Sequence, residues 1–356
     1  MHSLSTLAFL IGALVVSGGY CHREVETRSL DQIYEAAKAE GGVVTLWAGG
    51  DEKDQQNKLK DAFEARFPDI TLNLTVDLSK YHDGRIDEQL AAKNLYVDAT
   101  FLQSLHDFPR WKSQNALLNY QPLEFKNIFD EFKDSDGAYY GVFILFWSNI
   151  WNTDKIDAAS APKEYTDYLK PAFKDKLALT YPNDDDAVAF QFDLIIKQYG
   201  WEWFDDLIAQ NPHWVRGTAT PSTLLSPSLN NVYGATFTSE IGLASSGSLN
   251  ISFPTKGQFV SWPQTGAIFA DAPHPEGAKL LTNFVLSDEY QKASGWSVRR
   301  DLPGPSGYPT IFDMPGTNVT AFRDFMLDRA AVERLRFRFE DKIGTAQGFS
   351  PLVDDL

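Results

Sequence analysis

The chain is almost without cysteine, since Cys21 is the only one among its 356 residues. No internal disulfide can form, and no thiol nucleophile exists beyond that position. Basic residues are also few: 32 Lys and Arg stand against 48 Asp and Glu, which gives a formal net charge of −16. This balance argues against nucleic-acid binding, because phosphates need a basic surface. A cleft that carries the same sign of charge would favour a cation.

Several catalytic motifs are absent as well. The sequence has no GxGxxG after a strand, no GxxxxGKS/T, no HExxH and no GxSxG. Its six histidines do not stand at metal-ligand spacing. We therefore expect no enzyme activity, and we predict no catalytic residue, no metal site and no cofactor.

The apolar runs are too short to cross a membrane comfortably. The first 20 residues contain no Asp, Glu, Lys or Arg, and residues 7–16 form an apolar core of signal-peptide size. We interpret residues 1–20 as a cleaved secretory signal, with an uncleaved anchor as the alternative. We expect a secreted, extracellular protein that does not insert in a membrane after cleavage. Asn-x-Ser/Thr sequons, no more frequent than chance would give, mark three candidate glycosylation sites: Asn73, Asn250 and Asn318.

Strand and helix patterns alternate along the chain. A capping box at Ser29–Gln32 begins a helix, Val43–Ala48 is a buried strand, and Ile70–Val76 alternates apolar and polar residues. Strands that alternate with helices predict a mainly parallel sheet with helices on both faces. Ligands of such sheets bind beyond the carboxyl ends of the strands. The loops at residues 49–52 and 103–107 are therefore candidates for a binding cleft.

The most apolar stretch of the mature chain, Ala138–Trp151, is longer than one sheet usually needs. A strand that leaves one domain and enters another explains that length. A second α/β pattern follows, and the stretch at Gly266–Ala293 is typical of a strand that returns to the first domain, followed by a helix with Pro275 in its first turn. We predict residues 28–143 plus 266–356 as lobe 1, residues 148–258 as lobe 2, and residues 139–151 and 259–269 as the hinge crossovers.

Four stretches resemble a known family: "VVTLWAGGDEKDQQNKLKDAFEARFPDI", "YVDATFLQSLHDF", "YYGVFILFWSNIWNTDKI" and "APHPEGAKLLTNFVLSDEYQ". From about Leu30 to Leu335 the chain resembles type II extracellular solute-binding proteins of the iron(III)-, thiamine- and polyamine-binding branch. The resemblance implies two α/β lobes, two crossover strands as a hinge, and a small-molecule ligand that is held by lobe closure. Bacterial relatives deliver solutes to an ABC importer. Because the signal lacks basic residues, we expect a secreted eukaryotic (fungal) member that is monomeric and for which an importer is a doubtful partner.

The sequence departs from two branches of this family. Ferric-binding members use adjacent tyrosines in the second lobe, whereas the matching stretch here has Tyr233 alone and the pair Tyr139–Tyr140 lies in a crossover. The resemblance therefore implies no ferric site of that kind. Thiaminase I shares the fold but needs a cysteine nucleophile, which is missing. Two alternatives to a solute-binding protein stay open, namely an enzyme on the same fold and a secreted adhesion or interaction protein with a vestigial cleft.

Aromatic and acidic side chains near the predicted cleft point to a cationic or amine-bearing ligand, such as a polyamine or thiamine. For the tryptophans, core packing is the alternative; for the aspartates it is helix capping. Arg216 either binds an anionic group or pairs with a neighbouring Asp. The candidate ligand-binding residues are Trp47, Gly49, Gly50, Asp51, Gln103, Ser104, Trp147, Trp151, Asp184, Asp185, Arg216, Tyr233 and Trp262.

Overall fold

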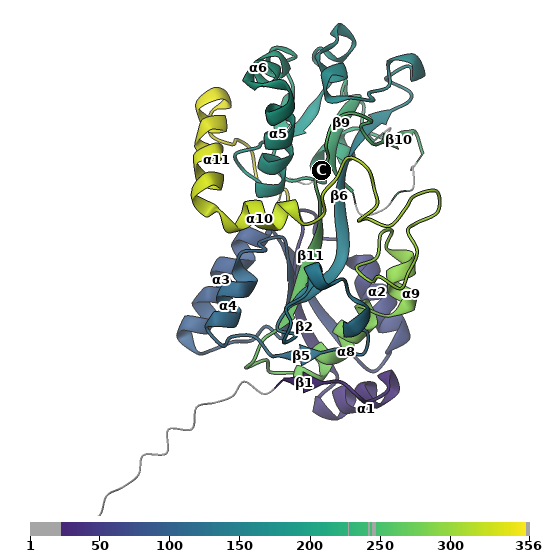
Figure 1. Ribbon diagram of the computed structural model, residues 1–356, viewed down its shortest axis with the longest axis vertical. Coiled ribbons are helices and arrows are strands. Elements are labelled where there is room, and N and C mark those ends of the chain that lie inside the picture. The colour runs from purple at the N-terminus through teal and green to yellow at the C-terminus, as the bar shows by residue number, and fades with distance from the viewer. Residues whose placement is uncertain (1–22, 227, 241–242, 244–246, 354–356) are drawn as a thin grey trace, which may run out of the picture.

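The computed structural model describes residues 23–226, 228–240, 243 and 247–353. The predicted signal peptide and Cys21 lie outside the described residues. Figure 1 shows an elongated molecule in which two strands, β6 (Tyr140–Asn152) and β11 (Ser261–Ile268), run along the long axis. The two strands pair antiparallel with each other. The two predicted crossover segments therefore lie side by side, and their role as a hinge stays a prediction.

The first group of elements surrounds the lower part of Figure 1. Its central strand, β2, pairs parallel with β3 and β4, and β4 joins this group to β11 through an antiparallel pair. Short strands β1 (Glu24–Val25) and β5 (Tyr120–Gln121) pair beneath it. The remaining elements are α1 (Leu30–Glu40), β2 (Val43–Gly49), α2 (Asn57–Arg66), β3 (Thr71–Asp77), α3 (Ser79–Ala92), β4 (Ala99–Leu102) and α4 (Asp107–Ser113).

The helix after β11 returns to this first group, as predicted. α8 (Pro275–Val285) begins with a proline and packs against α1 and β2, and the cap residue Ser287 begins α9 (Asp288–Ala293). The predicted capping box at the start of α1 is also present, because Ser29 and Gln32 each accept a hydrogen bond from the other's backbone N–H. A serine side chain thus caps the first turns of α1 and α9, whereas α8 begins with a proline, whose fixed φ suits a first turn.

The second group surrounds the upper part of β6. Strands β9 and β10 pair antiparallel with that part of β6, while β7 pairs parallel with β8. A bridge between Leu177 and Ala235 connects β7 to the start of β9. The antiparallel pairs between named strands of the described chain thus all involve β6 or β11. The elements of this group are β7 (Ala178–Thr180), α5 (Asp186–Tyr199), α6 (Trp201–Ala209), β8 (His213–Val215), α7 (Thr220–Leu224), β9 (Ala235–Glu240) and β10 (Leu249–Ser252).

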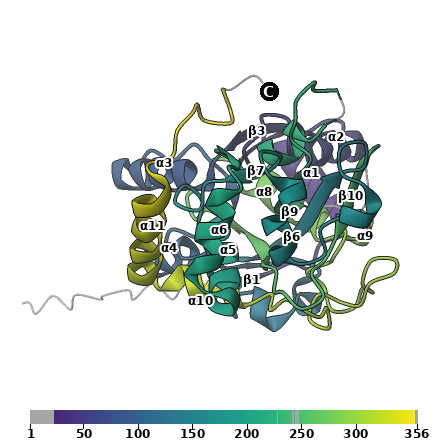
Figure 2. The ribbon, with the colours of Figure 1, turned by 90° about the horizontal axis from the view of Figure 1, so that it is seen from above.

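The contacts of the C-terminal helices differ from the predicted domain boundaries. α10 (Ala321–Leu327) and α11 (Arg329–Ile343) pack against α5 rather than only against the first group. The ring of Phe339 lies 5.9 Å from that of Phe192 and 5.2 Å from that of Phe204. Figures 1 and 2 both show α11 beside α5 and α6. Residues 266–356 therefore do not all lie with lobe 1; aromatic packing draws this end of the chain to the second group. The other predicted boundaries stay predictions.

The apolar composition of the two long strands explains why they lie at the centre. Every residue of β11 is buried, as is nearly every residue of β6. A strand that is covered on both faces gains apolar burial on both sides, so it needs no polar alternation. Among the helices of the described chain, none combines the length and the apolarity that crossing a membrane requires.

Candidate functional site

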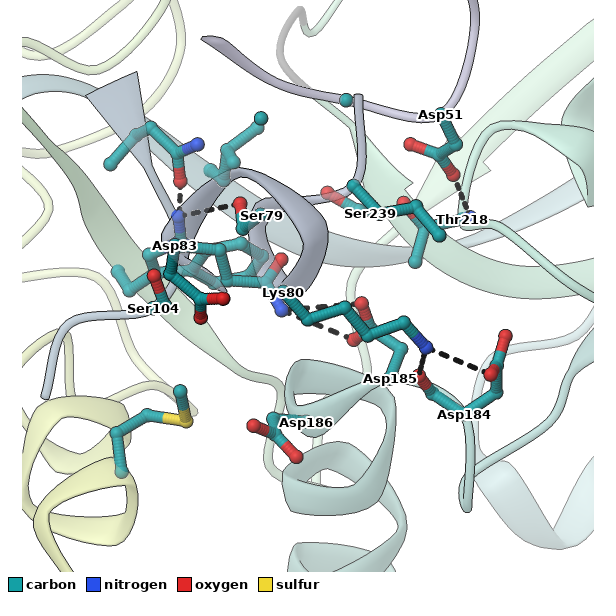
Figure 3. Close-up of a pocket in the computed structure, with 18 of the residues that line it drawn as sticks. Asp51, Ser79, Lys80, Asp83, Ser104, Asp184, Asp185, Asp186, Thr218 and Ser239 are labelled. Atoms are coloured by element: carbon teal, nitrogen blue, oxygen red, sulfur yellow. Dashed lines mark hydrogen bonds and ion pairs between the residues drawn. The ribbon is translucent and has the colours of Figure 1, made fainter. Parts of the chain in front are cut away.

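A cavity of about 150 Å³ lies where the two groups of elements meet. Its walls come from the loops after β2 and β4, the start of α3, the start of α5, and the loop between β8 and α7. The β2 and β4 ends are those that the sequence predicted, because parallel strands end at the same edge of a sheet. Figure 3 shows side chains from both groups around this space.

Two glycines allow the walls to approach closely. A Cβ on Gly49 would lie 2.2 Å from the Ser79 hydroxyl, so a larger residue at this end of β2 would displace the Ser79 side chain. Gly217 has a φ of +82°, which favours glycine, and a Cβ there would meet Pro351 and the Asp51 carboxylate at 2.8 and 2.9 Å. The C-terminal segment therefore closes against the same loop that lines the cavity.

Carboxylates dominate the charge of the cavity. They come from the loop after β2, from α3 and from the start of α5, and they face three cationic side chains, on Lys80, Arg329 and Arg336. His106 also lines the cavity, and burial lowers its pKa, so the imidazole is mostly neutral near pH 7. The carboxylates are those of Asp51, Asp83, Asp184, Asp185 and Asp186.

Asp185 connects the two walls while it caps α5. Its Oδ1 accepts hydrogen bonds from the backbone N–H groups of Ala187 and Val188, at 2.8 and 3.0 Å. From the opposite wall, the side-chain amide of Gln103 donates to both carboxylate oxygens at 3.2 and 3.3 Å. Burial, with a smaller effect of the nearby charges of Asp186 and Asp51, raises the pKa of Asp185 to about 6. Asp185 therefore caps α5, and it also lines the cavity.

A second carboxyl group, on Asp83, lies beside another acid. Burial and the adjacent Asp107 raise the pKa of Asp83 to about 7, and the two side chains hydrogen-bond when Asp83 is protonated. Asp107 is itself buried and accepts a 2.6 Å hydrogen bond from Arg110. Because two adjacent carboxylates repel, this pair holds a proton near neutral pH.

Other polar contacts cross the cavity directly. The Lys80 ammonium on α3 lies 2.8 Å from Asp184 Oδ1 and also donates to the Asp184 carbonyl at 2.6 Å. The Asp51 carboxylate accepts hydrogen bonds from the backbone N–H groups of Thr218 and Ala219. Each contact joins the first group of elements to the second. An ion pair and several hydrogen bonds therefore connect the two walls of the cavity directly.

Arg216 lies beside the cavity rather than in its lining. Its guanidinium donates to Asp184 at 2.9 Å and to the Tyr81 hydroxyl at 3.0 Å. Burial raises the pKa of Asp184, but the hydrogen bonds and positive charges of Arg216 and Lys80 outweigh it and lower the pKa below its ordinary value. The ion pair with a neighbouring Asp, one of the two roles considered for Arg216, is thus the one that the structure shows.

The structure places most of the predicted ligand-binding residues at the cavity. Those in its lining are Gly49, Gly50, Asp51, Gln103, Ser104, Asp184, Asp185 and Trp262.

The other aromatic candidates lie elsewhere. Trp47 stacks on the buried His82, with ring centroids 4.8 Å apart. Trp147 and Trp151 belong to the core, where the Trp147 indole donates to the Phe237 carbonyl at 3.2 Å. Tyr233 stacks on His213 outside the cavity, at 4.9 Å. For these residues the structure shows packing, the alternative that the sequence left open for the tryptophans.

Several lining residues carried no sequence signal. Apart from Met326, they are polar or charged residues within helices, where an amphipathic pattern predicts only a solvent face. α3 supplies Lys80 and Asp83, and the α10–α11 region supplies Met326, Arg329 and Arg336. Arg329 reaches Asp186 at 2.7 Å.

The described residues contain no group of three or more His, Cys, Asp or Glu side chains arranged to hold a metal. The adjacent tyrosines also lie away from the cavity. Tyr140 is buried in the core, and Tyr139 faces a different pocket.

Comparison with known families agrees with this architecture. The family model described as "Bacterial extracellular solute-binding protein" matches residues 67–297. The chain belongs to this family. Members are two-lobed binding proteins of mixed α/β structure, which is the fold class that the sequence predicted. No curated protein sequence matches the chain significantly.

Solved structures share the fold at low sequence identity. Iron-bound HitA from Pseudomonas aeruginosa has a TM-score of 0.62 at 16% identity, over 83% of this chain and 99% of that one. The substrate-binding protein of an ABC transporter from Agrobacterium tumefaciens reaches 0.71 at 14% identity, over 86% and 95%. AfuA from Actinobacillus pleuropneumoniae, with fructose-6-phosphate bound, reaches 0.64 at 15% identity, over 85% and 99%. These likenesses support the fold alone.

Proposed function

We propose that this chain captures a small cationic or amine-bearing solute in the cavity between its lobes and carries out no chemistry on it. One observation carries the proposal: five carboxylates line the cavity against three cationic side chains. Together with burial, the charge of the neighbouring Asp107 raises the pKa of Asp83 to about 7, and the charges of Asp186 and Asp51 raise that of Asp185 to about 6. A bound cation would relieve that repulsion, whereas an anion would increase it.

Asp186 is the carboxylate best placed to meet such a ligand. Asp184 already binds Lys80 and Arg216, Asp185 caps α5, and Asp51 accepts two backbone N–H groups. Asp186 has its ion pair with Arg329 and lines the cavity beside Asp83 and Asp185, as Figure 3 shows. Trp262 and Leu145 supply apolar surface for the carbon chain of an amine.

Charge also distinguishes this ligand from those of the structural relatives. HitA is described with iron and AfuA with fructose-6-phosphate. A phosphate group would face five aspartates here, and its binding would require several of them to be protonated or paired. We propose further that β6 and β11 act as the hinge and that the bonds between Asp51 and the Thr218 backbone and between Lys80 and Asp184 hold the closed form.

Calorimetric titration with spermidine, hexanediamine and thiamine tests this function, with hexanediol as the neutral counterpart of hexanediamine. We expect at least one of the amines to bind and the diol not to bind. In Asp186→Asn the dissociation constant should rise about ten- to hundredfold, as expected for the loss of a charged hydrogen bond.

The matched control is Asp206→Asn, at an exposed position on α6. It removes the same charge from the protein but not from the cavity, so the dissociation constant should stay unchanged. Equal binding of amine and diol, or an equal loss in both variants, would contradict the cationic ligand. Chemical conversion of the amine, detected by mass spectrometry of the ligand, would instead favour an enzyme.

We propose that the protein is secreted by a eukaryotic cell and that its sequons carry glycans. Asn73, Asn250 and Asn318 are all exposed, which supports access by the glycosylation machinery. Mass spectrometry of protein from the native source, before and after enzymatic removal of N-glycans, tests this. An unchanged mass would contradict it, and delivery to an ABC importer would then become the more plausible fate of the solute.

A further inference from the structure

A second cavity, of about 330 Å³, is lined by Tyr139 at the start of the first crossover and by Pro263 and Thr265 of β11. We name it the hinge pocket and define it by Leu105, Phe132, Tyr139, Val319, Arg323 and Leu327. Its volume falls in the range of small-molecule sites.

The floor of the hinge pocket is apolar. Leu105, Phe132 and Val319 are all buried, and Pro263 of β11 adds to the same surface. Displacing water from such a floor favours a ligand with an apolar body.

Two donors face this apolar floor. Burial raises the pKa of Tyr139, so its hydroxyl keeps its proton and can donate a hydrogen bond. The Arg323 guanidinium is close enough to influence that hydroxyl electrostatically. Arg323 also donates to the Glu131 carbonyl at 2.9 Å, which fixes it across the mouth of the pocket.

The other charged groups at this pocket are occupied or solvated. The Lys133 ammonium donates to the carbonyls of Phe125 and Ile128, at 2.9 and 2.7 Å. Asp324 lies 3.6 Å from Arg323 with its side chain 71% exposed, so this pair is weak. The Glu131 residue is exposed as well. Arg323 can therefore exchange Asp324 for the carboxylate of a ligand.

We propose that the hinge pocket is a second binding site, for a small apolar molecule that carries one carboxylate. The apolar body lies on the floor formed by Leu105, Phe132 and Val319, and the carboxylate meets Arg323 and the Tyr139 hydroxyl. This proposal does not rest on the solute proposed for the interlobe cavity, because the linings of the two cavities have no residue in common.

Calorimetric titration of the full protein with naphthoate, and with the neutral naphthamide, tests this proposal. We expect naphthoate to bind at one site per chain and at least tenfold more tightly than naphthamide. Arg323→Gln should weaken naphthoate about tenfold, since a charged hydrogen bond is lost. Leu327→Glu should weaken it further by adding a negative charge at the rim.

Both substituted side chains are partly exposed, Arg323 at 45% and Leu327 at 53%, so the variants should fold. Two variants on α11 serve as matched controls, because Arg334 and Phe337 are exposed and lie outside the pocket. Arg334→Gln and Phe337→Glu should bind naphthoate as the unmodified protein does. The proposal is overturned by absence of naphthoate binding, by equal binding of the amide, or by equal affinities in the pocket and control variants. Melting temperatures of all four variants would show whether each is folded.

Discussion

The interlobe cavity and the hinge pocket share two structural elements but differ in chemistry. Ser104 and His106 face the interlobe cavity, while Leu105 between them faces the hinge pocket. On α10, Met326 lines the first and Leu327 the second. Residues that are adjacent in the sequence thus line a charged cavity on one side and an apolar pocket on the other. The comparison teaches that position in the sequence alone does not assign a residue to a site; the direction of its side chain does.

The difference in charge predicts how each site responds to change. The interlobe cavity is held by charged and hydrogen-bonded contacts between its walls, whereas the hinge pocket depends mainly on apolar surface. A change of pH between 8 and 5 should therefore act strongly on amine binding, since Asp83 and Asp185 line only the interlobe cavity, and weakly on naphthoate binding. The amine therefore probes the interlobe cavity, and naphthoate probes the hinge pocket.

The largest effect is expected from Asp51→Ala. This change removes a charged acceptor of the Thr218 and Ala219 backbone N–H groups, so the closed form is destabilised. The amine dissociation constant should rise about ten- to hundredfold in calorimetric titration. Asp54→Ala, at an exposed position three residues later, is the control and should leave it unchanged. If naphthoate weakened as much as the amine in Asp51→Ala, the two sites would not be independent.

The pH dependence of amine binding should be the next largest effect. Burial and Asp107 raise the pKa of Asp83 to about 7, and burial raises that of Asp185 to about 6. Below these values the carboxyl groups take up protons that a bound cation must displace. Affinity should therefore fall about tenfold per pH unit below pH 7 for each coupled proton. Calorimetry between pH 8 and pH 5 checks this, and an affinity that rose on acidification would contradict the cationic ligand.

Stability should change in the same pH range. The pKa of Asp83 is higher in the folded protein than its ordinary value of 3.8, so the folded state binds this proton more tightly. The contribution of Asp83 to stability is thus full below about pH 4 and falls as the pH rises to about 7. Asp83→Asn, whose amide can donate to Asp107 at every pH, should be about 1–2 kcal/mol more stable than the native protein at pH 8.

Urea unfolding at pH 8 and pH 4 measures this difference. The gain should disappear at pH 4, and the exposed control Asp61→Asn should show little change at either pH. A loss of stability at pH 8 in Asp83→Asn would mean that the carboxylate is favourably paired, contrary to the account.

The smallest effect is expected from Gln103→Ala. Its amide donates to Asp185 at 3.2 and 3.3 Å, which is long for such hydrogen bonds. Amine affinity should fall only about two- to threefold, because a single weak neutral donor is lost. A loss as large as that in Asp51→Ala would show that Gln103 contacts the solute.

Local patterns in the sequence predicted much of the fold. The capping box at Ser29, the long strand at Tyr140–Asn152 and the proline that begins α8 each depend on neighbouring residues, and all are present. The packing of α11 on α5 was not predicted, because it depends on Phe339 meeting Phe192 and Phe204 from distant parts of the chain.

The candidate site likewise combines residues whose position follows from local sequence patterns with residues whose position depends on tertiary packing. Gly49, Asp51 and Gln103 follow strand ends, so the topology of a parallel sheet places them at the cavity. Asp83 and Arg329 lie within or at the start of helices, and only tertiary packing turns them inward. The tryptophan predictions failed at Trp47 and Trp147 because a buried aromatic next to a cleft packs as well against His82 or Trp262 as against a ligand.

The central claim, that negative charge in the interlobe cavity selects a cation, is tested most directly by the protons exchanged on binding. Calorimetry of the tightest-binding amine at pH 7, in two buffers of different ionisation enthalpy, measures this number. A group with a pKa of about 7 is half protonated there, so about half a proton should be released per ligand bound, and Asp83→Asn should abolish most of that release. Proton uptake on binding, or an unchanged release in Asp83→Asn, would contradict the account.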